Sequence, residues 1–163
     1  MARAARQGLS GVREDPGYYD YWPYRDRPKI AWPGGKRLAF WVAPNIEFYE
    51  LNPPANKFRA AWPTPYPSIP GYSIRDYGNR VGHLRQMKLL DKYGIRGSIS
   101  LSAALCEHHP EIVALCRERN WEFFSHGIYN TRYTYGLSEA QERAMIEDSL
   151  ETIERATGRR PAG

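Results

Sequence analysis

The chain has 163 residues, of which 42% are hydrophobic, and a formal net charge of +5 at pH 7. This is enough for one domain with a buried core, and no stretch approaches the roughly 18 consecutive apolar residues of a membrane span. The excess positive charge lies at the two ends rather than in a basic stripe with stacking aromatic residues, which disfavours nucleic-acid binding.

The N-terminal region and the cysteines indicate the compartment. The first residues carry positive charge but no apolar segment of the kind found in secretory signals. Cys106 and Cys116 are ten positions apart and are expected on different faces of a helix, so they are predicted to be reduced, packed thiols. Together these features predict a cytoplasmic protein.

The N-terminal part of the chain reads as irregular. Residues 1–36 are rich in Pro, Gly, Arg and Tyr and show no apolar period, so we predict an irregular arm there. The predicted domain, 37–163, opens with a strand over 37–48 whose continuous apolar character is typical of a strand covered on both faces. The proline-rich segment 49–73 follows, and we expect it to shape a binding pocket.

Helices and strands alternate along the rest of the chain. They are a helix over 75–94, a strand over 95–103, a helix over 108–120, a strand over 121–127 and a helix over 137–158. Ser138 is predicted to cap the last helix, with Gln141 three positions on, and Gly158 to end it. This order indicates a parallel α/β fold. Because a barrel needs about eight strands, we expect the chain to be the N-terminal part of a longer protein.

Polar side chains follow the three predicted strands at their carboxyl ends, where ligands bind in parallel α/β proteins. They are Asn45 and Glu47, then Ser100 and Ser102, then Ser125 and His126. Glu47 and His126 are expected to converge there as general base and acid, or to contribute to a metal site. Two alternatives stay open: His126 as a hydrogen-bonded structural residue, and Glu47 in a salt bridge with Arg59 or Arg80.

A second candidate lies in the segment RDYGNRVG at 75–82, just before the body of a predicted helix whose N-terminal end could hold an anion. Tyr77 and Arg80 are therefore candidates for substrate binding. In the alternative, Asp76 caps the helix and pairs with Arg80. The adjacent His108 and His109 are not predicted to bind a metal together, because neighbouring side chains at a helix start point in different directions.

Several segments match a known family in order and spacing from about Tyr18 onward. They are YYDYWPYRDRP, WPGGKRLAFWVAPNIEFYE, DYGNRVGHLRQMKLLDKYGIRGSISLSAALCEHHPEI, NWEFFSHG and LETIERATGRRPAG. In these segments the chain resembles the polysaccharide deacetylase (NodB-homology) family, allantoinase-like branch. The resemblance implies a distorted (β/α) barrel of the glycoside hydrolase/deacetylase type, cut near its middle. It also implies hydrolysis of a carbon–nitrogen bond in a small-molecule amide, cyclic ureide or N-acetyl sugar or, alternatively, an inactive ligand-binding domain.

The resemblance also shows where this chain departs from metal-dependent members. Those members place paired aspartates after the first strand and two histidines four apart after the third, whereas this chain has Asn45 and Glu47, then His126 and Asn130. This ligand set is incomplete for zinc, so no cofactor is predicted, and His126 and Glu47 would be the ligands of any metal.

Two further roles follow from the same comparison of motifs. Asn45 and Asn130 are expected to bind substrate, since an amide offers both donors and an acceptor. The segment RRPAG matches a family motif in which an arginine orders the catalytic carboxylate, and Arg160 is the candidate for that role.

Overall fold

The computed structural model describes residues 22–54 and 67–163. The chain divides into two compact units, Met1–Ala39 and Phe40–Gly163. The described part of the first unit contains neither an α-helix nor a β-strand, only two short 3-10 turns, Tyr24–Asp26 and Pro33–Gly35. Most of the predicted arm, and the middle of the proline-rich segment including Arg59, lie outside the described residues.

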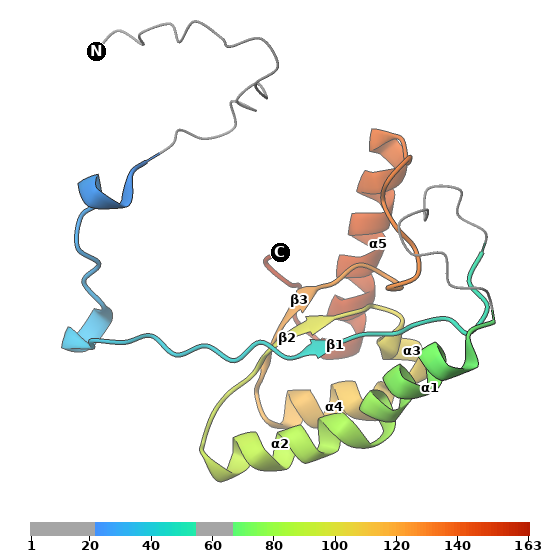
Figure 1. The fold of residues 1–163 in the computed structure, drawn as a ribbon, viewed down its shortest axis with the longest axis horizontal. Coiled ribbons are helices and arrows are strands. Elements are labelled where there is room, and N and C mark those ends of the chain that lie inside the picture. Colours follow the sequence, from blue (N-terminus) through green and yellow to red (C-terminus); the bar gives the residue numbers. More distant parts are fainter. Residues whose placement is uncertain (1–21, 55–66) are drawn as a thin grey trace, which may run out of the picture. The chain divides into compact units, whose positions relative to one another are not determined.

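Three parallel strands form one sheet in the order β1 (Asn45–Ile46), β2 (Ser98–Leu101) and β3 (Glu122–Ser125), as Figure 1 shows. This confirms the predicted parallel α/β fold. The first strand is much shorter than the predicted strand over 37–48. Backbone amides on the β2 side reach the carbonyls of Val42, Pro44 and Ile46, but Pro44 has no N–H to donate in return. The regular ladder is therefore short.

The first helical region is one continuous run of α1 (Ile69–Tyr77), a π-helical turn (Gly78–Gly82) and α2 (His83–Lys92). It begins earlier than the predicted start at residue 75 because Ser68 caps it. The Ser68 hydroxyl accepts a hydrogen bond from the Gly71 backbone N–H at 3.3 Å. Gly94, with a φ of +63°, ends the region as predicted.

The remaining helices are α3 (Leu105–His108), α4 (Pro110–Glu118) and α5 (Glu139–Thr157). The helix predicted over 108–120 is confirmed as α4, which opens with Pro110, and α3 is an additional short helix before it. The predicted ends of α5 are confirmed, because Ser138 and Gln141 form a reciprocal capping box and Gly158 is left-handed with a φ of 76°.

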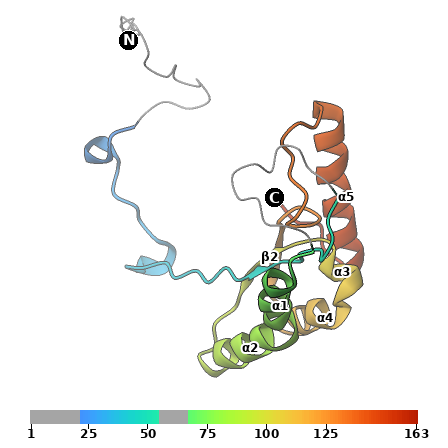
Figure 2. The same cartoon turned by 45° about the vertical axis from the view of Figure 1, so that its right-hand side comes forward.

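The core lies where the helices meet one face of the sheet (Figure 1, Figure 2). Both the strands and the helices contribute fully buried residues to this core. They are Ile46, Ile99 and Leu101 on the strands, and Met87, Leu105, Ile112 and Ile153 on the helices. Asn45, on the opposite face, is exposed. The prediction that the first strand is covered on both faces is therefore wrong for the described residues.

Both cysteines are free thiols, but Cys106 lies on α3 and Cys116 on α4, so the prediction that they share one helix is wrong. Burial raises the pKa of Cys106 to about 11 and that of Cys116 to about 12, so both stay protonated and unreactive, which matches packed thiols. Among the described residues, no helix has the length and apolar character needed to cross a bilayer.

Candidate active site

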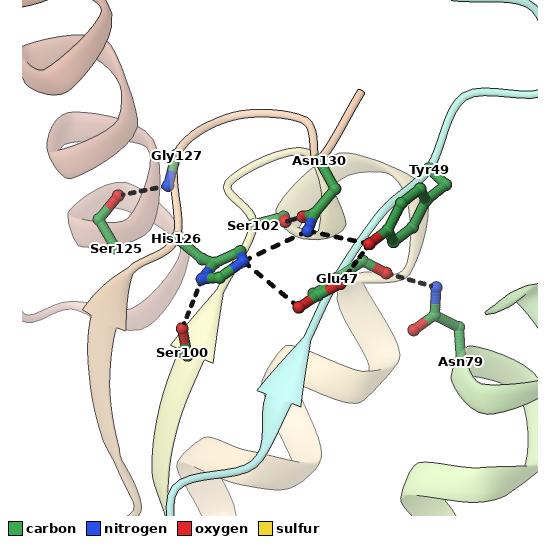
Figure 3. A network of polar contacts seen from close by, with 9 residues as sticks. All are labelled: Glu47, Tyr49, Asn79, Ser100, Ser102, Ser125, His126, Gly127 and Asn130. Carbon is green, nitrogen blue, oxygen red and sulfur yellow. Dashed lines mark hydrogen bonds and ion pairs between the residues drawn. The ribbon is translucent and has the colours of Figure 1, made fainter. Parts of the chain in front are cut away.

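Glu47 and His126 meet at the carboxyl end of the sheet, as predicted (Figure 3). Glu47 follows β1 and His126 follows β3, so the two are separated by β2 rather than carried on adjacent strands. Small side chains on the central strand leave room above it, and His126 Nε2 lies 3.3 Å from Glu47 Oε1. Both side chains keep contact with solvent, with 34% of the His126 side chain and 24% of the Glu47 side chain exposed.

Ser100 supports the imidazole from below. Its Oγ lies 2.8 Å from His126 Nδ1. On the other side of the ring, the Asn130 amide nitrogen lies 3.2 Å from His126 Nε2. An amide nitrogen can only donate, so we assign the ring proton to Nδ1, facing Ser100, and to Nε2 the lone pair that accepts the Asn130 hydrogen bond. An unprotonated nitrogen and a carboxylate oxygen thus lie side by side and open to solvent.

Asn130 is held in one orientation by neighbours from two other strand ends. Its Oδ1 accepts a hydrogen bond from the Ser102 hydroxyl at 2.6 Å, and its Nδ2 donates to the Tyr49 hydroxyl at 3.3 Å. The turn at Gly127, with a φ of +75°, brings the chain back so that Asn130 reaches its partners. The spacing of four residues from His126 therefore does bring these two side chains together.

Two residues of this cluster were not predicted from the sequence. Tyr49 donates its hydroxyl to Glu47 Oε2 at 2.8 Å, and burial, followed by this bond, raises the pKa of Tyr49. Asn79, whose side chain is buried, donates Nδ2 to the backbone carbonyl of Glu47 at 3.0 Å. Tyr49 could have been found from its spacing, because it lies two residues after Glu47. Asn79 lies in the segment RDYGNRVG that was a candidate for anion binding, but nothing in the sequence indicated a contact with Glu47.

The structure does not bring the predicted residues Tyr77 and Arg80 to this cluster. Both are exposed on the continuous helical region, and Arg80 pairs with Asp76. Since the helix begins at Ile69, no free helix N-terminus exists at this point to hold an anion, and the predicted anion site is wrong. The alternative prediction, in which Asp76 caps the helix and pairs with Arg80, is half right. The ion pair between Asp76 and Arg80 is confirmed, but Ser68 caps the helix. The salt bridge considered between Arg80 and Glu47 is likewise absent from the described contacts.

Arg160 does not order Glu47, contrary to the prediction. Its guanidinium binds Glu147 at 2.6 Å and Glu154 at 3.2 Å, both on α5. Arg160 also lines a cavity of about 520 Å³ beside Ser98 and Glu122, at the amino ends of β2 and β3. The catalytic candidates lie at the opposite ends of these strands, so Arg160 cannot reach them.

The other predicted residues have simpler positions. Asn45 pairs with Ser100 in the sheet register and lies two residues before Glu47, on the same side of β1. Its role in binding substrate stays a prediction. His108 and His109 point to different partners, Tyr129 and Glu111 respectively, as expected for adjacent residues at a helix start.

Comparison with known proteins identifies the family of the chain. Residues 75–163 match the model of the polysaccharide deacetylase family. The chain belongs to the polysaccharide deacetylase family. A search of curated protein sequences finds no match.

Solved structures show the same fold for this polysaccharide deacetylase domain. The chain is 25% identical to the crystal structure of Puue allantoinase, with a TM-score of 0.74 over 91% of this chain and 52% of that one. For a probable polysaccharide deacetylase from Pseudomonas aeruginosa PAO1 the values are 24% identity and 0.72, over 85% and 50%. The chain thus spans about half the length of these structures.

The zinc site of metal-dependent family members does not fit the residues found here. The described residues contain no group of three or more His, Cys, Asp or Glu side chains placed to hold a metal ion. His126 and Glu47 converge and could supply two ligands. Asn130, where a third ligand would be needed, turns its N–H group toward His126, because its oxygen accepts a hydrogen bond from Ser102. A donor hydrogen cannot coordinate zinc, which takes three protein ligands in catalytic sites.

Proposed function

We propose that the protein hydrolyses a carbon–nitrogen bond in a small amide, a cyclic ureide or an N-acetyl sugar. The observation that carries this proposal is the 3.3 Å approach of His126 Nε2 to Glu47 Oε1 at a solvent-accessible strand end. Membership of the polysaccharide deacetylase family and likeness to an allantoinase structure support the reaction class. Two free cysteines are compatible with a cytoplasmic location, which is part of the proposal.

The chemistry runs through the lone pair on His126 Nε2. Once a substrate oxygen accepts the Asn130 hydrogens in place of His126 Nε2, a water molecule next to Nε2 gives up a proton to the imidazole, and its oxygen adds to the carbonyl carbon of the substrate. Glu47 Oε1 stabilises the resulting imidazolium. The carbon–nitrogen bond then breaks and the proton on Nε2 moves to the leaving nitrogen. A positioned acid–base group of this kind accelerates a reaction by about 10² to 10⁴-fold.

The amides of Asn45 and Asn130 complete the proposed site as substrate-orienting groups. Asn130 supports this role because its Nδ2 hydrogens lie against His126 Nε2, where the reacting carbonyl has to bind. A substrate carbonyl oxygen bound there would accept the Asn130 hydrogen that His126 Nε2 accepts now. The Asn130 amide would therefore bind the substrate without rotating.

A substrate panel tests the proposal. The protein is assayed with ureides, cyclic imides, simple amides and N-acetyl sugars, and the release of product is measured. We expect turnover of at least one compound and a loss of about 10² to 10⁴-fold in kcat for His126→Ala. His83→Gln, on α2 and outside the cluster, serves as the control and should keep full activity.

Two results would contradict the proposal: no turnover of any compound, or full activity of a folded His126→Ala variant. Thermal stabilisation by a compound without turnover would indicate a ligand-binding domain instead. A ligand at about 100 times its Kd adds roughly 2.7 kcal/mol to the free energy of unfolding, which a thermal melt detects.

A further inference from the structure

We propose that Tyr49 and Asn79 are positioning residues that fix Glu47 from two sides, so that one chosen carboxylate oxygen faces His126. The inference rests on the proposed function, because it assigns to Glu47 the role of partner to the imidazole. Neither residue was among the site residues predicted from the sequence. Figure 3 shows both beside Glu47, Tyr49 at the carboxylate and Asn79 at the backbone.

Tyr49 holds the carboxylate itself. Its hydroxyl donates to Glu47 Oε2 at 2.8 Å, while the second oxygen, Oε1, lies 3.3 Å from His126 Nε2. The two oxygens of a carboxylate lie in one plane, so a strong bond to one of them limits the rotation that would carry the other away. A hydrogen bond to a charged acceptor is roughly twice as strong as a neutral one, which makes this restraint effective.

The direction of the Tyr49 hydrogen bond is fixed by its other partner. A phenol oxygen has one hydrogen, and the Asn130 amide nitrogen at 3.3 Å can only donate to that oxygen. The hydroxyl hydrogen is therefore left for Glu47. A phenol keeps this hydrogen at neutral pH, and burial raises the pKa of Tyr49 further above its ordinary value. Above the ring, the Arg75 guanidinium carbon lies 4.2 Å from the centroid and packs the phenol in position.

Asn79 holds the backbone of the same residue. Its Nδ2 donates to the Glu47 carbonyl oxygen at 3.0 Å, and only 6% of Asn79 is exposed. Asn79 lies in the π-helical turn Gly78–Gly82 between α1 and α2. Such turns insert an extra residue and shift the phase of the helix, and they are frequent at functional sites. Here the turn directs a buried amide onto the strand end that carries Glu47.

Tyr49→Phe tests this role, because it removes one hydroxyl and keeps the ring. With the substrate found in the panel, we expect kcat to fall by about 10 to 100-fold, the loss that corresponds to one hydrogen bond to a charged group. KM should change by less than about threefold, since the change acts on the reacting group and not on ground-state binding. Tyr93→Phe, an exposed tyrosine at the end of α2, is the matched control and should leave both constants unchanged. An unchanged kcat in a folded Tyr49→Phe protein would overturn the inference.

A second readout separates this inference from the proposed function. In protein labelled with ¹⁵N-asparagine, the side-chain amide resonances of Asn130 report the contact with Tyr49. We expect Tyr49→Phe to shift them and Tyr93→Phe to leave them in place, even if no compound of the panel is hydrolysed. Unshifted Asn130 resonances in Tyr49→Phe would overturn the arrangement on which the inference depends.

Asn79→Leu provides an independent variant, because it removes the donor and keeps a similar volume. We expect the same pattern, with kcat lowered and KM nearly unchanged. A folded Asn79→Leu protein with full kcat would remove Asn79 from the inference. Since Asn79 is buried, its variant has the greater risk of unfolding, and the conservative Tyr49→Phe change keeps the inference testable in that event.

Discussion

Asn130 stands where the family resemblance implied a second metal-binding histidine. Its amide uses both ends: the oxygen accepts from Ser102, and the nitrogen donates to Tyr49 and His126. A histidine at this position has one donor and one acceptor when neutral, so it cannot serve all three neighbours in the same way. Asn130 therefore belongs to a network of side-chain hydrogen bonds. It does not act as a metal ligand in place of the histidine.

The variant Asn130→His tests this reading. We expect it to lower turnover by about tenfold or more, the cost of losing a positioned hydrogen bond, and added zinc should not restore the rate. Zinc binding is measured by calorimetry alongside turnover. Tight zinc binding together with zinc-dependent activity in Asn130→His would contradict the reading and favour a latent metal site.

Glu50 ties the loop after β3 to the segment after β1, next to the cluster. Its carboxylate accepts hydrogen bonds from Arg132 Nη2 at 2.7 Å, Arg132 Nε at 3.0 Å and Thr131 Oγ1 at 2.7 Å. The bonds from Arg132, more than any other contact, lower the pKa of Glu50.

This lowered pKa predicts an acid-sensitive stability. The stabilisation from Glu50 is complete at neutral pH and is lost as the pH falls below the unfolded value of about 4.3 and through the lower folded value. Glu50→Gln should lower stability at pH 7 and flatten its decline in acid, as measured by urea unfolding at several pH values. Glu151→Gln, on an exposed position of α5, is the control. Parallel stability curves for Glu50→Gln and the unchanged protein would contradict the prediction.

At the level of elements, the contact between the start of β2 and the start of β3 is unusually close. A Cβ added to Gly97 would lie 3.0 Å from Trp121 Cε3 and 3.1 Å from Cδ2. Trp121 is only 4% exposed and belongs to the core, so the ring has little room to move. This position therefore requires glycine for packing rather than for backbone conformation.

Gly97→Ala should lower the free energy of unfolding by about 1 to 3 kcal/mol, the usual cost of overpacking a core. The measurement is urea unfolding followed by tryptophan fluorescence. Gly78→Ala is the matched control, because an added Cβ there meets nothing within 4 Å and its φ of −56° suits a helix. Its stability should stay equal or rise by up to about 1 kcal/mol. Equal losses in the two variants would contradict this account of Gly97.

The success of sequence-based prediction also varied from element to element. The ends of α5 were predictable because Ser138, Gln141 and Gly158 act within one turn of the chain. The start of the first helical region was not, since its cap, Ser68, lies inside a proline-rich segment that masks helical periodicity. Strand β1 was predicted too long because apolar character does not reveal the donor missing at Pro44.

Across the whole molecule, the parallel order of strands explains which part of the site was predictable. Carboxyl ends of parallel strands share one edge, so Glu47 and His126 could be brought together from the sequence alone. The contact of Asn79 with residue 47 depends on the phase set by a π-helical turn, which no residue pattern specifies. Arg160 was assigned from a motif, and the carboxylates of α5 hold it elsewhere.

We propose that His126 and Glu47 hydrolyse a carbon–nitrogen bond without a bound metal. Turnover of the panel substrate after exhaustive treatment with a chelator measures this most directly, with each sample assayed again after zinc is added. We predict that chelation leaves the rate unchanged and that zinc adds nothing, while His126→Ala abolishes the rate under both conditions. Activity that chelation abolishes and zinc or a related ion restores would contradict the account.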